Sequence, residues 1–184
     1  MKKSKRFPLP SKKMDLSSVP SGVFYDGIKE PAFAAKFGEM ASLWPHIEDK
    51  MIDVLTELLG GDYGLPSRQI YRSIISPQAR IKVLRSLLER TEMNQRKDEI
   101  YDEILNEFSS LNDLRNTYLH GLWHTHEGGR VFFIEASVDE TSLFENREVK
   151  IEEIVSAIGK MTDLEDRISD LIDGEQVIRE AQST

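Results

Sequence analysis

The chain has 184 residues, a formal net charge of −8 and no cysteine. Its length suits one domain with its own core, and 39% hydrophobic with 30% charged residues is typical of a folded protein in water. The lack of cysteine excludes thiol catalysis, disulfides and cysteine-ligated metal sites. The negative charge argues against a protein that coats nucleic acid by electrostatics alone, but a chain of this charge can still act on RNA at one focused site.

The N-terminal segment, residues 1–30, is predicted to be a flexible basic tail. Proline, glycine and serine are scattered through it among lysine and arginine. A solvated tail is the simpler interpretation, and contact with nucleic acid is the alternative. The segment lacks the apolar stretch of a secretory signal, and no apolar run in the chain reaches the roughly 18 residues that cross a bilayer. A cytoplasmic protein with no membrane partner is therefore expected.

A single helical domain is predicted for residues 31–184, and apolar periodicity begins it. Apolar residues recur every three or four positions between Phe33 and Leu58, which indicates a helix with one buried face. Pro45 interrupts the pattern, so either a kink or two consecutive helices are expected there. Gly60-Gly61 is predicted to end this stretch.

Three further helices are expected before residue 121. Ser67 is a candidate N-cap for a short helix, and Ser76-Pro77 is a start signal for the next one, with serine as the cap and proline at the first helical position. A long helix is then predicted from about Asp98 to His120, with apolar residues along one side.

The pattern changes after Gly128-Gly129. Residues 130–135 are rich in β-prone side chains and are predicted to pair with a segment near 142–150 as a small hairpin. C-terminal helices are predicted over 151–182, with Asp173-Gly174 closing the apolar-periodic helix. The fold class is mainly α, an up-and-down bundle of four to five helices with a minor β-hairpin.

Polar residues form a stripe on the long predicted helix. Asn112, Asn116 and His120 are spaced four apart, so they share one side. Arg115 lies about 100° from Asn116, toward the apolar side. A guanidinium there requires a partner, which is a carboxylate of the chain, a second subunit or a phosphate ligand. The plainer interpretation is a solvated helix side with an arginine in a structural pair.

The motif Arg115-Asn116-x-x-x-His120, late in a long helix and followed by Gly121 and Trp123, resembles the signature of HEPN-domain proteins. The resemblance covers roughly residues 33–126. It implies a helical bundle and a metal-independent endoribonuclease that acts as a homodimer on RNA. A toxin or defence effector, with a cognate antitoxin or a regulatory protein as partner, is also within what the resemblance implies.

The resemblance makes Arg115, Asn116 and His120 the catalytic candidates, and their residue types suit RNA cleavage through the 2′-hydroxyl. Histidine moves protons near neutral pH, arginine stabilises the phosphate and asparagine orients it. One motif holds one histidine, so a second subunit would supply the second. Asn112, His124 and His126 are predicted to contact substrate.

One alternative and one departure accompany this prediction. Some family members are non-catalytic dimerisation or interaction modules that bind RNA or a partner protein, which the charge of −8 favours. Leu122 stands where some members carry tyrosine, so regulation by modification of that tyrosine is not implied.

A metal site formed by the histidines and base stacking by the tryptophans are two further interpretations. His120, His124 and His126 could hold a metal if the helix continued, but Gly121 and Gly128-Gly129 make that continuation uncertain. No metal and no cofactor are predicted. Trp44 and Trp123 adjoin apolar periodic positions, which favours packing over base stacking.

Overall fold

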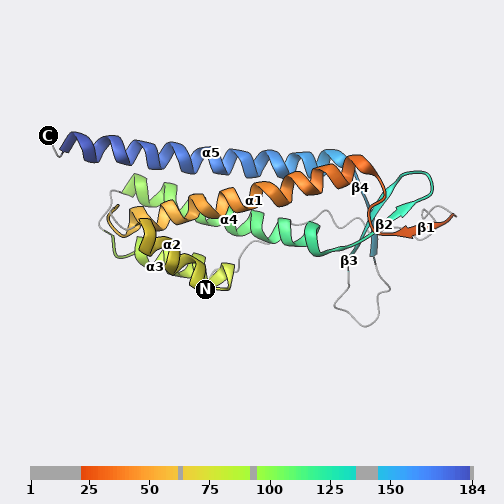
Figure 1. Ribbon diagram of the computed structural model, residues 1–184, viewed down its shortest axis with the longest axis horizontal. Helices are drawn as coiled ribbons and strands as arrows, with labels where there is room; N and C mark the ends of the chain where they lie inside the picture. Colours follow the sequence, from red (N-terminus) through yellow and green to blue (C-terminus); the bar gives the residue numbers. More distant parts are fainter. Residues whose placement is uncertain (1–21, 62–63, 92–94, 136–144, 183–184) are drawn as a thin grey trace. The chain divides into compact units, whose positions relative to one another are not determined.

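The computed structural model describes residues 22–61, 64–91, 95–135 and 145–182, and they form five helices and four strands (Figure 1). The mainly helical fold with a minor β part is confirmed. Residues 1–21 of the predicted tail lie outside the described residues, whereas 22–30 include a strand. In chain order the elements are β1 (Phe24–Asp26), α1 (Pro31–Leu58), α2 (Gly64–Ser73), α3 (Pro77–Leu88), α4 (Gln95–His120), β2 (Leu122–His126), β3 (Val131–Glu135), β4 (Glu145–Val149) and α5 (Ile151–Gln182).

The chain divides into two compact units. The first, here the sheet unit, comprises the chain up to Ala41 together with Leu114–Ile158. The second, here the helical unit, comprises Ser42–Asp113 and the chain from Gly159. Helices α1, α4 and α5 each contribute residues to both units.

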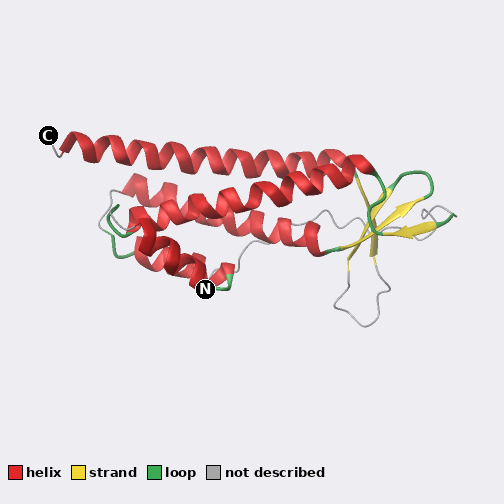
Figure 2. Cartoon of the chain, in the orientation of Figure 1, coloured by secondary structure: helices red, strands yellow, loops and turns green. Residues whose placement is uncertain are grey.

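The sheet unit contains a four-stranded antiparallel sheet in the order β1-β2-β3-β4. Its strands are drawn in yellow in Figure 2. The predicted hairpin is confirmed as β3 and β4, with Val131 opposite Val149. Strands β1 and β2 were not predicted. They enlarge the hairpin into a sheet, which places the residues after His120 in a strand.

One face of this sheet holds an aromatic cluster. Trp123 of β2 lies opposite Phe133 of β3, with ring centroids 5.0 Å apart. Phe37 of α1 meets Trp123 edge to face at 5.0 Å, and Tyr118 of α4 lies 6.0 Å from Trp123. The Trp123 indole N–H donates to the Tyr118 carbonyl oxygen at 2.9 Å, so the buried ring is also hydrogen-bonded. Trp123 is therefore a packing residue that ties the end of α4 to the sheet.

The helical unit is built on the predicted apolar stripes. Trp44 of α1 stacks on Phe108 of α4 with centroids 5.1 Å apart, and both rings are buried. The N-cap at Ser76 is confirmed, since its hydroxyl accepts from the Ala79 N–H at 3.4 Å and Pro77 follows at the first helical position. Helix α1 is one continuous helix with Pro45 inside it, so of the two alternatives expected at Pro45, two consecutive helices is wrong.

Two predicted helix boundaries are also wrong. Ser67 is not a cap: α2 begins at Gly64, and Ser67 is a fully buried residue inside it. Pro66 occupies the first turn, where its missing N–H has no helical acceptor to lose. Gly174 does not end α5, which continues to Gln182. An interior glycine costs a helix only about 1 kcal/mol, so it need not terminate one.

Asp53 of α1 allows a test of how one ionised carboxylate affects the stability of the helical unit. Burial raises the pKa of this carboxyl, Asp49 adds to the rise, and Lys50 and Arg68 oppose it. The folded state therefore holds the proton more tightly than the unfolded state, and its stability falls as pH rises through the folded pKa. Asp53→Asn is expected to be more stable than the wild type at pH 7, by less than about 1 kcal/mol because solvent screens this partly exposed charge.

Urea unfolding at pH 7 and at pH 4 measures this effect. The advantage of Asp53→Asn should shrink at the lower pH, where more of the wild-type carboxyl is protonated. Asp163→Asn, at an exposed position of α5, is the control and should show no such change. A destabilised Asp53→Asn at pH 7 would show that the charge is favourable in the fold.

Candidate functional site

The last turns of α4 carry the candidate site, and Gly121 directly follows them. A Cβ on Gly121 would lie 2.6 Å from the Thr117 carbonyl oxygen and would also overlap the ring of Phe133. Real Cβ atoms essentially never come that close to main-chain oxygen. Only glycine fits here, at the point where the chain leaves α4 after His120 and enters β2.

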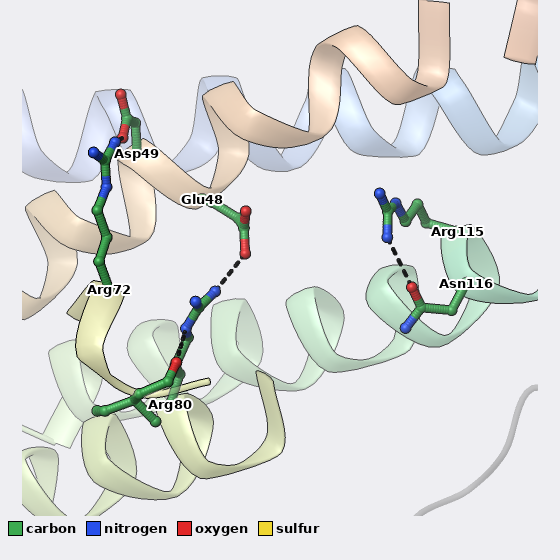
Figure 3. Close-up of polar contacts among 7 residues, drawn as sticks. Glu48, Asp49, Arg72, Arg80, Arg115 and Asn116 are labelled. Carbon is green, nitrogen blue, oxygen red and sulfur yellow. Dashed lines mark hydrogen bonds and ion pairs between the residues drawn. The ribbon is translucent and has the colours of Figure 1, made fainter. Parts of the chain in front are cut away.

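Arg115 and Asn116 are in direct contact (Figure 3). The Arg115 Nη1 donates to the Asn116 Oδ1 at 2.9 Å. Neighbouring helical residues point about 100° apart, so the long arginine side chain bends around the helix to reach the polar stripe. With its carbonyl oxygen occupied, Asn116 has its amide N–H groups left as the donors that a ligand can use.

The Arg115 guanidinium has no acidic partner in the part of the chain that the structure describes. The side chain is half-buried, and its Nε is buried without a hydrogen-bond partner among the same residues. A buried donor without an acceptor costs roughly 1–3 kcal/mol. From the sequence we expect a carboxylate of the chain, a second subunit or a phosphate ligand as the partner of Arg115. No carboxylate partner is found among the described residues. A second subunit or a phosphate ligand therefore remains as the source of the acceptor.

His120 and Asn112 occupy different environments on the same helix. His120 is exposed and is the last residue of α4, and no hydrogen bond joins it to Arg115 or Asn116 in the described structure. Asn112 lies one turn before Asn116 and is only 4% exposed. The structure thus brings Arg115 and Asn116 together and leaves His120 accessible beside them on the chain, while Asn112 is buried.

His124 and His126 lie in β2, where alternation places both on the same face of the strand. The Nδ1 of His124 lies 3.3 Å from Asp26 Oδ1 on the neighbouring strand β1. His126 is 9% exposed, packs edge-on against Phe24 and accepts at Nδ1 from the Gly128 N–H. The neutral ring therefore carries its proton on Nε2, which is buried without a partner among the described residues.

The arrangement of the histidines bears on metal binding. The helix ends at His120, so His120 and His124 are not on one helical face. In the described ranges, no three histidine, aspartate or glutamate side chains are grouped so that they could hold a metal ion.

A second cation in the sheet unit was not anticipated from the sequence. Arg147 of β4 donates to Glu153 at 2.5 Å, and its Nη2 is buried without a hydrogen-bond partner in the described structure. Burial raises the pKa of nearby Tyr118, with Arg147 opposing the rise, so the phenol stays neutral. Alternation along a strand could have shown that Arg147 and Val149 share a face, but no sequence feature indicated that an arginine would be half-buried there.

Comparisons with known proteins do not extend this description. No protein-family model, no curated protein and no solved structure matches the chain. Among the described residues, no helix combines the length and apolar composition needed to span a lipid bilayer. Fold and site together define a mainly helical protein with a small sheet and an arginine–asparagine pair beside an exposed histidine.

Proposed function

We propose that this chain is a metal-independent endoribonuclease of the HEPN type. One observation carries the proposal: Arg115 has no acidic partner among the described residues and is held against Asn116, five residues before an exposed histidine. A phosphate would supply the acceptors that the guanidinium lacks, in the bidentate geometry that arginine prefers.

The reaction assigns a role to each of the three side chains. The neutral His120 imidazole removes the proton from a ribose 2′-hydroxyl, whose oxygen attacks the adjacent phosphorus. Arg115 stabilises the added charge on the phosphorane, and the free Asn116 N–H groups orient its oxygens. The bond from phosphorus to the 5′-oxygen then breaks, leaving a 2′,3′-cyclic phosphate and a 5′-hydroxyl.

The departing 5′-oxygen needs a proton, and one motif contains one histidine. A homodimer that brings two motifs to one cleft would supply a second imidazole as the acid. Dimerisation is thus part of the proposal. A toxin or defence role, with an antitoxin or regulatory protein as partner, would follow from the activity only if cleavage is harmful to the cell.

Incubation of the purified chain with transfer and messenger RNA in EDTA tests the proposal. Cleavage in the chelator is the expected result, because none of the three roles uses a metal. Intact RNA after incubation with a folded dimer would remove the enzymatic assignment.

A non-catalytic interaction module is the second candidate, and the net charge of −8 favours it, because bulk charge repels RNA. Such a module would bind RNA or a protein through the Arg115–Asn116 surface without cutting. Gel-shift and cleavage assays on the same sample separate the two functions: binding that depends on Arg115, with intact RNA, identifies the module.

A further inference from the structure

A small polar cleft lies within the helical unit, between α1, α2 and α3. Its volume is about 140 Å³, and its walls include Glu48, Asp49, Arg72 and Arg80 with the apolar Pro45 and Ile52. Sites for drug-sized ligands measure about 300–1,000 Å³, so this cleft suits a fragment the size of a single ring system.

Arg80 is fixed at one wall of the cleft. Its Nε donates to the Ile74 carbonyl oxygen at 2.7 Å, and its Nη1 donates to Glu48 at 2.5 Å (Figure 3). The Arg80 guanidinium also lies 4.7 Å from the centre of the Tyr71 ring. The Arg80 side chain is 15% exposed. These contacts leave Nη2 as a preorganised donor, which loses little freedom on binding.

The acidic residues of the cleft wall, Glu48 and Asp49, also have carboxylate oxygens that can accept further hydrogen bonds. Glu48 accepts from Arg80 through one carboxylate oxygen, and the described residues give the other no partner. Asp49 is contacted by Arg68 and Arg72 through one oxygen at 3.4 Å each, which is a loose ion pair. Arg72 is 62% exposed, so its fork can turn toward a ligand.

The balance of charge in the walls limits the kind of ligand. Two carboxylates and two guanidiniums line the cleft, so a phosphate would meet Glu48 and Asp49, and a cation would meet the two arginines. A neutral ligand with adjacent donors and acceptors can use the free positions, keeps the Arg80–Glu48 pair and displaces only the loose Arg72–Asp49 pair. Nucleobases have this character, with flat faces that suit Pro45, Ile52 and a guanidinium plane.

We propose that this cleft binds a guanine base. Guanine is the base that offers two adjacent donors, N1–H and N2–H, to a carboxylate such as Glu48. It also offers two acceptors, O6 and N7, to an arginine fork. The ribose and any phosphate would remain outside. The inference stands apart from RNA cleavage, because every wall residue belongs to the helical unit and none belongs to the Arg115–His120 segment.

Calorimetric titration of the full-length protein with nucleosides tests the ligand side, since nucleosides carry no phosphate. Guanosine should bind at least about tenfold more tightly than adenosine or cytidine. Inosine lacks the N2 amino group and 7-deazaguanosine lacks N7, so each should bind more weakly than guanosine. No binding of guanosine up to its solubility limit, or equal binding of all nucleosides, would overturn the proposal.

Protein variants test which residues contact the base. Arg72→Ala should weaken guanosine binding about tenfold. Arg85→Ala should not, because Arg85 pairs with Asp102 and Asn106 and does not line the cleft. Glu48→Gln should reduce the preference for guanosine over inosine. If Glu48→Gln fails to fold, Arg72→Ala and the nucleoside analogues still test whether guanosine binds in this cleft. Unchanged guanosine binding by Arg72→Ala would contradict the assigned site.

Discussion

Replacing His120 with alanine is expected to lower RNA cleavage by roughly 10²–10⁴-fold, which is the usual contribution of a positioned acid or base. The free energy of unfolding should stay within about 0.5 kcal/mol of the wild type, because His120 is exposed and surface substitutions seldom cost more. Cleavage rates in EDTA and urea unfolding of the same preparations measure the two quantities.

His46→Ala is the matched control, since His46 is also an exposed histidine on a helix. It should keep wild-type activity. Wild-type cleavage by His120→Ala would remove His120 from the mechanism, and an equal loss in His46→Ala would show that the effect is not specific to His120.

Gly121→Ala is expected to destabilise the sheet unit by about 1–3 kcal/mol or more, the cost of overpacking a filled site. The added methyl group meets a main-chain oxygen of α4 and the ring of Phe133, which is 6% exposed and packed against Trp123. Neither can move without disturbing the connection between α4 and β2. Displacement of His120 by about 1 Å would also cost activity about 10²-fold.

Gly38→Ala is the control for this change. Gly38 lies within α1 in the sheet unit, and a Cβ there has no neighbour within 4 Å. Alanine should stabilise this helix by about 0.5–1 kcal/mol. Thermal unfolding of both variants gives the comparison, and a Gly121→Ala protein as stable and active as the wild type would show that the connection after His120 is not constrained.

Apolar periodicity predicted α1, α4 and α5 well, because each buries apolar residues at helical spacing. It was a poorer guide to α2, which buries Ser67 and Tyr71 and leaves Ile70 44% exposed. The three-residue β1 left no such signal, since it lies among turn-forming residues and forms only by pairing with β2, about a hundred residues later. Strand β2 was hidden because its Trp, His and Thr residues directly follow a long helix. Ser67 was misjudged because a serine before apolar residues resembles a cap, whereas packing buried it.

The candidate site also has features that residue spacing predicted and features that it could not predict. Spacing alone grouped Asn116 with His120, and it set Arg115 apart by its angle on the helix. The Arg115–Asn116 hydrogen bond depends on how a long side chain bends, which spacing cannot express. The burial of His126 followed from an unpredicted strand. Glu48, Tyr71 and Arg80 meet only through tertiary packing, so their cleft had no sequence signature.

The end group left on a defined RNA after incubation in EDTA tests the proposed catalytic site most directly. Proton removal by His120 and in-line attack by the 2′-hydroxyl leave a 2′,3′-cyclic phosphate, and mass spectrometry of the fragments identifies it. We predict this end on the wild-type products and no such product from His120→Ala or from RNA with a 2′-deoxyribose at the cut position. Fragments ending in a 3′-hydroxyl, or cyclic phosphate formed equally by His120→Ala, would contradict the assignment.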